Sequence, residues 1–144
     1  HALTAALHSG RFLREYLAVC EGCPSPAAGT IDAPLGRTDT SYIRQEVRPD
    51  GKSARTHYQV MEQGDRFSLV RLTLETGRTH QIRVHMAYIG HPLTGDFLYG
   101  TEDPALISRP ALHSAHLELC QPFTEEKLSF DAPFPKDMAR LTGM

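Results

Sequence analysis

Apolar and polar side chains alternate along two neighbouring stretches in the middle of the chain. Residues 56–61 and residues 70–75 each place an apolar or β-branched side chain at every second position. Strands with one buried face have this period of two. Gly64-Asp65 lies between the two stretches and is typical of a tight turn. The pattern therefore predicts an antiparallel hairpin.

A helical spacing follows soon after the second of these strands. Ile82, Met86 and Ile89 stand at positions i, i+4 and i+7, which is the apolar stripe of a helix packed on a core. Thr79 is expected to cap the start, because its hydroxyl can accept a hydrogen bond from a free first-turn N–H. Gly90 suits the left-handed position just past a helix end. The spacing predicts a helix from Thr79 to Gly90.

The rest of the chain predicts a second helix and further strands. Helical spacing is expected over residues 2–13, strands over 15–20, 30–35, 112–120 and 127–131, and polar or breaker-rich loops over 22–29 and 36–52. A length of 144 residues suits one domain. We therefore expect one α+β domain over residues 1–144, with a mixed, mainly antiparallel sheet and flanking helices.

Charge and composition change this picture only slightly. The net charge is −2 and the pI is near 6.5. Proteins that bind nucleic acid mainly through its phosphates are usually basic, so the overall charge argues mildly against that function. A local basic patch is still compatible with it, because the charge that counts is the charge gathered on one face.

The cysteines argue against a disulfide framework and against a metal site. There are three of them, and an odd, sparse set is not typical of disulfide-stapled proteins. Cys20 and Cys23 have the spacing of a zinc half-site, but a structural zinc needs four ligands and no second pair is present. With no apolar run of membrane-spanning length, a reduced cytoplasmic location is expected. Neither a metal nor a nucleotide cofactor is expected.

The start of the predicted helix gathers polar side chains. Arg78, Thr79, His80 and Arg83 converge there, and Gln81 lies on a neighbouring face. Free backbone N–H groups and the positive end of the helix dipole make such a start a natural anion site. A solvated helix face with a surface arginine explains the same pattern. The residues alone leave both readings open.

Two other residues have a structural and a functional reading each. Tyr16 lies in a predicted strand, where it is either a core aromatic or a stacking face and proton donor at a site. Asp96 follows a glycine, and a carboxylate in that position more often caps a turn than acts as a catalyst.

The segment from Thr76 to His85, TGRTHQIRVH, resembles the hallmark motif of the RluA-type pseudouridine synthases, which modify ribosomal and transfer RNA. Weaker matches occur in the family's order along nearly the whole chain. They are Arg14-x-Tyr16-Leu17-Ala18, Pro34-Leu35-Gly36-Arg37, Gly51-Lys52 with Thr56 and Tyr58, Gly90-His91-Pro92-Leu93 with Gly95-Asp96 and Tyr99-Gly100, and Leu112-His113-Ser114.

The resemblance implies an RNA pseudouridine synthase that isomerises uridine without a cofactor. Such enzymes flip the target base out of its stack, attack the nucleoside with an Asp carboxylate, and rejoin the rotated base through carbon. A tyrosine packs on the base, and an arginine pairs with the Asp. Carried onto this sequence, the catalytic residues are Tyr16 and Arg83. Arg78, Thr79, His80 and Gln81 are expected to bind RNA.

The nucleophile of that family lies in an H-R-L-D-x-x-T-S-G block, and these 144 residues contain no such block. We therefore expect the chain to be the C-terminal part of the catalytic domain, truncated at its N-terminus and inactive by itself. An alternative is a non-catalytic RNA-binding module derived from the same fold. A structural domain with no role in RNA is a third reading, which the density of motifs disfavours.

Overall fold

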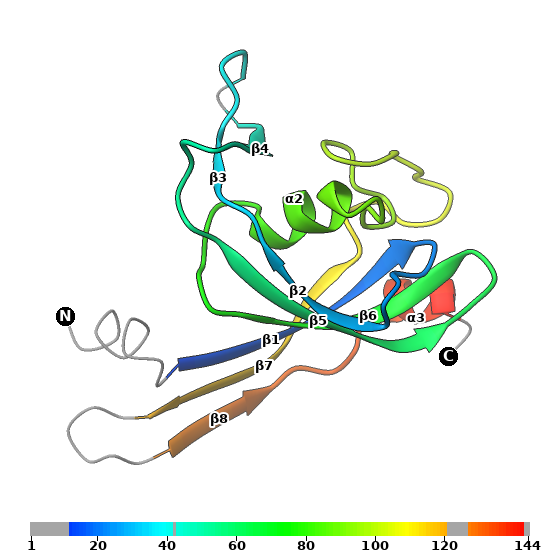
Figure 1. Ribbon diagram of the computed structural model, residues 1–144. Coiled ribbons are helices and arrows are strands. Elements are labelled where there is room, and N and C mark those ends of the chain that lie inside the picture. Colours follow the sequence, from blue (N-terminus) through cyan, green and yellow to red (C-terminus); the bar gives the residue numbers. More distant parts are fainter. Residues whose placement is uncertain (1–11, 42, 121–126, 143–144) are drawn as a thin grey trace.

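The computed structural model describes residues 12–41, 43–120 and 127–142, and a six-stranded sheet forms its centre (Figure 1). Its strands are β1 (Phe12–Glu21), β2 (Ala28–Asp32), β5 (Arg55–Gln63), β6 (Phe67–Leu74), β7 (Leu112–Cys120) and β8 (Lys127–Asp131). They lie in the order β2-β5-β6-β1-β7-β8, with antiparallel neighbours throughout. A small second sheet pairs β3 (Leu35–Arg37) with β4 (Gln45–Val47).

Two described helices, α2 (Gln81–Tyr88) and α3 (Lys136–Thr142), cover opposite faces of the large sheet (Figure 1). Because strand side chains alternate between faces, β1 contributes to both cores. Ala18 and Cys20 belong to the core beneath α2, and Val19 belongs to the core beneath α3. The α2 core is completed by Ile31, Ala33, Tyr58, Val70, Leu72, Ile82, Met86 and Leu93, and the α3 core by Leu69, Ile107, Ala111 and Met138.

The β3–β4 hairpin stands beside the start of α2, away from the large sheet (Figure 1). Leu35 packs with Ala54 and with Val84 of α2, and Tyr99 partly covers this small cluster. At Gly51, an added Cβ would lie 2.5 Å from the carbonyl carbon of Leu35. Only glycine lets the chain return this closely, so Gly51 helps to fix the hairpin against the helix.

The expected fold class and central hairpin are confirmed. The fold is α+β with a mainly antiparallel sheet, and every ladder among the described residues is antiparallel. Strands β5 and β6 pair as predicted, and the turn between them is closed by a 2.8 Å hydrogen bond from Gly64 N to Phe67 O. The strands expected over 15–20, 112–120 and 127–131 are present in β1, β7 and β8.

The predicted helix is present as α2, but it begins differently. His80, not Thr79, occupies the N-cap, with a left-handed φ of 55° and no side-chain cap. The side-chain oxygen of Gln81 accepts the hydrogen bond from Arg78 N, so the first residue of the helix reaches back and holds the turn itself. The predicted end is confirmed, because Gly90 has a φ of 88°.

Other predicted boundaries shift for local reasons. The strand expected over 30–35 is split, because Pro34 between β2 and β3 has no N–H to donate to a ladder. Strand β4 and helix α3 were not predicted. Of the helix expected over 2–13, residues 12 and 13 belong to β1, and residues 2–11 lie outside the described part. No helix among the described residues is long and apolar enough to cross a membrane.

Candidate functional site

The side chain of Gln81 holds the hallmark segment in place from inside the protein. Its Oε1 accepts hydrogen bonds from Thr76 Oγ1 (2.7 Å) and Arg78 N (3.0 Å). Its Nε2 donates to Arg55 O (3.0 Å) and Thr56 Oγ1 (2.9 Å). The side chain is almost fully buried, and its amide is satisfied by these four bonds. Gln81 therefore ties the end of β6, strand β5 and the start of α2 together.

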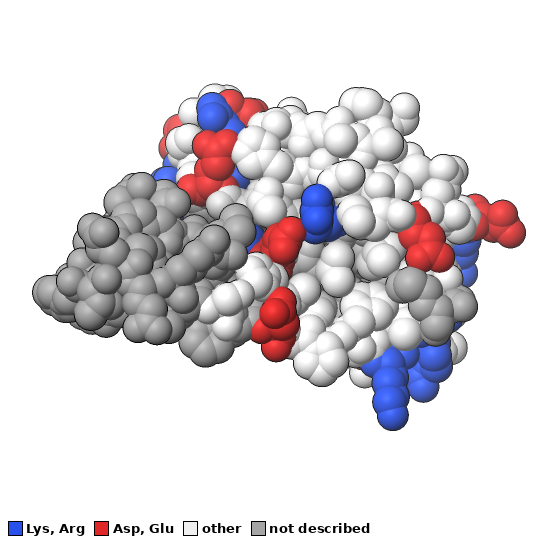
Figure 2. Space-filling view, turned by 90° about the horizontal axis from the view of Figure 1, so that it is seen from below, with Lys and Arg blue, Asp and Glu red and all other residues white. Residues whose placement is uncertain are grey.

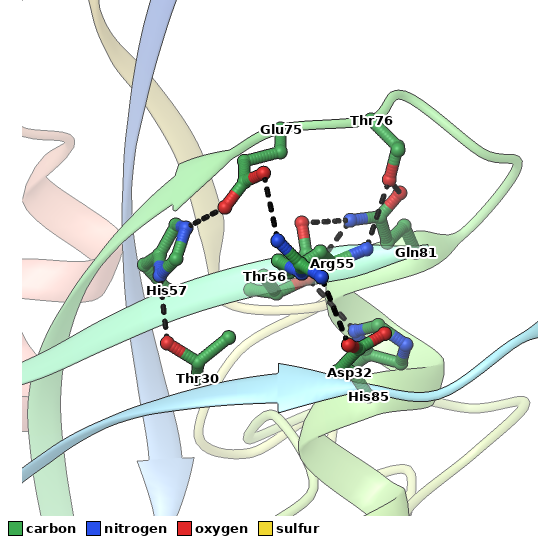
Figure 3. A network of polar contacts seen from close by, with 9 residues as sticks. All are labelled: Thr30, Asp32, Arg55, Thr56, His57, Glu75, Thr76, Gln81 and His85. Carbon is green, nitrogen blue, oxygen red and sulfur yellow. Dashed lines mark hydrogen bonds and ion pairs between the residues drawn. The ribbon is translucent and has the colours of Figure 1, made fainter. Parts of the chain in front are cut away.

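His85 extends this network one turn further along α2 (Figure 3). Its Nε2 lies 2.9 Å from Ala33 O and its Nδ1 lies 2.8 Å from Thr56 Oγ1. A carbonyl can only accept, so Nε2 is the donor and Nδ1 accepts from the Thr56 hydroxyl. Burial lowers the pKa of His85, which agrees with this neutral tautomer. The helix is thereby fixed to β5 and to the connection after β2.

Arg83 lies on another side of α2 and is gripped by a buried carboxylate. Its Nε donates to Asp96 Oδ2 at 3.0 Å, and its Nη2 donates to Asp96 Oδ1 at 2.8 Å. Backbone N–H groups of Leu98 and Tyr99 also donate to Asp96 Oδ1, at 3.0 and 3.1 Å. Burial alone would raise the pKa of Asp96, but Arg83 and these two N–H groups hold it below its usual value. Asp96 is therefore an ionised partner of Arg83.

Aromatic rings surround the Arg83 guanidinium. Its Cζ lies 5.2 Å from the ring centroid of Phe97 and 5.2 Å from that of Tyr99, within the range of cation–π contacts. The Tyr99 hydroxyl lies 2.7 Å from His80 Nδ1 and accepts a hydrogen bond from Gln45 N at 2.9 Å. Burial and the nearby Arg83 lower the pKa of His80. Tyr99 thus links the helix start to the β3–β4 hairpin.

A cleft of about 580 Å³ lies between the β3–β4 hairpin and the start of α2. Its lining includes the basic residues Arg37, Lys52 and Arg78, together with Thr79. Arg78 Nε donates to Ser53 O at 2.8 Å, which anchors this arginine at the rim. A cleft with three cations and one carboxylate, that of Asp50, can attract an anion such as a phosphate.

Tyr16 lies on the face of the sheet that α2 covers. Its side chain packs against the core cluster that contains Ile82 of α2. The pairing of β1 with β7 shifts register between Glu15 and Tyr16, and such bulges commonly redirect a side chain. The described residues show no hydrogen bond between Tyr16 and Arg83. The structure thus places both on the same side of the sheet without joining them.

The structure sorts the residues predicted from the sequence into two groups. Arg78 and Thr79 line the cleft, whereas His80 bonds to Tyr99 and Gln81 is buried and satisfied within the chain. The turn-capping reading of Asp96 is confirmed by its bonds to two backbone N–H groups. Its grip on Arg83 was missed, because a separation of thirteen residues across a loop carries no periodic signal.

The opposite face of the sheet carries an exposed polar network instead (Figure 3). Thr30 Oγ1 lies 2.8 Å from His57 Nδ1, and His57 Nε2 hydrogen-bonds Glu75. Arg55 pairs with Glu75 at 3.3 Å and with Asp32 at 3.1 Å. Figure 2 shows the molecule from below, where acidic and basic side chains are scattered singly or in small groups among uncharged ones. The part of this face that the structure describes is therefore not a broad basic surface.

The cysteines do not form a metal centre in the described part of the chain. Cys20 is buried in the core, and burial raises the pKa of its thiol to about 12. Among the described residues, no group of three or more His, Cys, Asp or Glu side chains is placed to hold a metal ion.

Comparisons with known proteins identify the family. The model of a family described as RNA pseudouridylate synthase matches residues 1–88. The chain is 50% identical over 139 residues to the uncharacterized RNA pseudouridine synthase YjbO of Bacillus subtilis, covering 96% of this chain and 49% of that protein. It is 44% identical over 153 residues to the ribosomal large subunit pseudouridine synthase D of Vibrio cholerae, covering 97% and 47%.

Solved structures agree with the sequence matches. Human RNA pseudouridylate synthase domain containing 1 superposes with a TM-score of 0.78 at 29% identity, covering 92% of this chain and 58% of that one. The chain belongs to the RNA pseudouridylate synthase family, and its resemblance to the RluA-type members is confirmed. It spans about half the length of the curated relatives it matches.

Proposed function

We propose that the full-length gene product is an RNA pseudouridine synthase that isomerises uridine in ribosomal RNA. The observation that carries the proposal is the family match over residues 1–88, which includes both Tyr16 and Arg83. Ribosomal RNA is preferred to transfer RNA because the relative from Vibrio cholerae is named for the large ribosomal subunit. A cytoplasmic location and a reaction without cofactor belong to the same proposal.

Arg83 and Tyr16 are the catalytic residues of this proposal. The reaction breaks the bond from C1′ to N1, rotates the base and joins C1′ to C5. C5 then loses its proton and N1 gains one, so the product is an isomer of uridine. Tyr16 packs against the flipped base, and its hydroxyl assists removal of that proton. Arg83 presents a fixed guanidinium to the nucleophilic Asp, because its orientation is already set by Asp96 and two rings. A cation beside a carboxylate keeps it ionised.

RNA enters, in this proposal, along the cleft between the β3–β4 hairpin and α2. Arg78 and Lys52 both line that cleft, and Thr79, which also lines it, is exposed. Phosphate contacts of this kind position a nucleic acid without reading its sequence. His80 and Gln81 contribute by shaping the helix start, since their described polar contacts lie within the protein.

The test is tritium release from RNA labelled at C5 of uridine, since only bond formation at C5 displaces that hydrogen. The full-length gene product is incubated with ribosomal RNA fragments or with transfer RNA, both made without modification. Release from the ribosomal fragments supports the proposal, and Arg83→Ala should slow it by about 100-fold or more. Release from transfer RNA alone would replace the proposed substrate, and release from neither would remove the proposed activity.

The 144 residues by themselves should bind RNA without turning it over. They contain no H-R-L-D-x-x-T-S-G block, and positioning groups do not replace a covalent nucleophile. Pseudouridine formation by this chain alone would contradict this. A full-length gene product that binds RNA but releases no tritium would favour the alternative of a non-catalytic RNA-binding module.

A further inference from the structure

Asp96 sets the orientation of Arg83, although the expected mechanism pairs this arginine with the nucleophilic Asp. A guanidinium has five N–H donors in a rigid plane. Two of them, on Nε and Nη2, are used by Asp96. No hydrogen bond to Nη1 is seen among the described residues. The bidentate grip therefore leaves one edge of the guanidinium, with both N–H groups of Nη1, to face a second anion.

The position of the Asp96 carboxylate is fixed independently of Arg83. Its side chain is fully buried, and Oδ1 also accepts the N–H groups of Leu98 and Tyr99. Gly95 precedes it with a φ of 77°, and an added Cβ there would lie 2.5 Å from Ile107 Cγ2. The loop can therefore carry Asp96 to this depth only with glycine at position 95. The carboxylate is a fixed point to which the arginine conforms.

We infer that Asp96 is a positioning residue for catalysis, which fixes the plane of Arg83 so that its Nη1 edge faces the reaction. This inference rests on the proposed function. Bidentate carboxylate pairs restrict a guanidinium in angle as well as in distance, and the rings of Phe97 and Tyr99 restrict the remaining rotation. Without Asp96, Arg83 keeps its charge but loses its direction.

The chain offers a matched control in a second pair with the same geometry. Arg109 Nε donates to Asp137 Oδ2 at 3.0 Å, and Arg109 Nη2 donates to Asp137 Oδ1 at 3.0 Å. This pair joins the segment before β7 to α3, on the side of the sheet away from α2. If Asp96 had only a structural role, substituting it would lower stability and leave the reaction rate unchanged, as is expected for Asp137.

The test compares Asp96→Asn with Asp137→Asn in the full-length gene product. Asparagine keeps one oxygen for the backbone N–H groups, but its NH₂ group meets an Arg83 donor, so the cap survives while the bidentate grip fails. The rate of tritium release is measured in a single turnover at saturating RNA, beside the RNA Kd and the Tm. We expect Asp96→Asn to lower the rate about 100-fold, the cost of a small misplacement, with a nearly unchanged Kd. Asp137→Asn should lower only the Tm.

A double-mutant cycle shows whether Asp96 acts through Arg83. Adding Asp96→Asn to Arg83→Ala should slow the reaction no further, since effects through one partner do not add. A further fall of about 100-fold in the double variant would overturn the inference. So would an Asp96→Asn rate within about threefold of the unmodified protein. If the unmodified protein itself released no tritium, the proposed function would fail and this inference with it.

Arg83→Lys keeps the inference testable if Asp96→Asn does not fold. Lysine retains a cation beside the buried carboxylate but lacks the planar fork. If direction matters, Arg83→Lys should be as slow as Arg83→Ala at saturating RNA. A lysine variant within about threefold of the unmodified protein would show that charge alone suffices, and would overturn the inference.

Discussion

Two threonine–histidine hydrogen bonds of equal length lie on opposite faces of strand β5. Thr56 Oγ1 and His85 Nδ1 are 2.8 Å apart beneath α2, and Thr30 Oγ1 and His57 Nδ1 are 2.8 Å apart on the other face. Thr56 and His85 are fully buried, whereas the His57 side chain is 40% exposed. Water can replace the exposed bond but not the buried one. The two bonds have equal lengths, but because only one of them is buried, we expect them to contribute unequally to stability.

The difference extends to the residues joined to each pair (Figure 3). The buried pair continues into Gln81 and so into the start of α2, where Arg83 and the cleft are placed. The exposed pair continues into ion pairs of Arg55 with Glu75 and Asp32, which are about half exposed. Exposed pairs of this kind typically contribute about 0.2–1 kcal/mol. The buried network fixes the position of the candidate site, and the exposed network lies at the solvent-facing surface of the sheet.

The largest effect should come from Gln81→Ala. It removes four hydrogen bonds at once, to Thr76, Arg78, Arg55 and Thr56, and a typical hydrogen bond contributes about 0.5–1.5 kcal/mol. We expect the free energy of unfolding in urea to fall by about 3 kcal/mol or more. The control is Gln59→Ala on the other face, where the amide accepts from the exposed Arg71. Equal losses from the two variants would show that burial does not separate the faces.

Thr56→Val and Thr30→Val compare the two threonines directly, because valine keeps the shape and removes the hydroxyl. Thr56→Val leaves Gln81 Nε2 and His85 Nδ1 each short of a partner, so we expect a loss of about 1–3 kcal/mol. Thr30→Val should change stability by no more than about 0.5 kcal/mol. Urea unfolding of both variants measures the contrast, and a costlier Thr30→Val would reverse it.

His85 should contribute to the pH dependence of the free energy of unfolding. Its pKa is lowered in the folded protein from the usual 6.5 by burial, so the unfolded chain binds more protons below that value. Stability is then complete above about pH 6.5 and falls with pH by at most about 1.4 kcal/mol per unit. His85→Gln should flatten this fall between pH 6.5 and 5. An unchanged slope in His85→Gln would show that His85 already takes up its proton in the folded state.

The sequence predicted the parts of the fold that a short period encodes. The alternation over 56–61 and 70–75 gave β5 and β6, and the stripe of Ile82, Met86 and Ile89 gave α2. Strand β4 and helix α3 were missed, because three residues in a polar stretch and seven beside two prolines hold too little pattern. Short elements of this kind depend on the surfaces they pack against.

The sequence named residues of the candidate site but not the contacts that they make. Arg78 and Thr79 precede α2 and line the cleft, His80 bonds to Tyr99, and Arg83 pairs with Asp96 from within the helix. The sequence did not show that Gln81 faces inward, since its neighbours come from β5 and from the end of β6. Nor did it show the partner of Arg83, which arrives on a loop beyond Gly90. Contacts between segments are fixed by tertiary packing, which spacing along one helix does not encode.

The smallest expected effect separates the two faces by RNA binding. Arg78 lines the cleft beside α2, whereas Arg71 lies on the opposite face, paired with Glu15 at 3.3 Å. Loss of one phosphate contact should make the plot of log Kobs against log salt shallower by about 0.7–0.9. We expect this change for Arg78→Ala and no change for Arg71→Ala, measured by filter binding of a ribosomal RNA fragment across a salt series. A shallower slope for Arg71→Ala would place RNA on the polar face instead, and would remove the cleft from the proposed path.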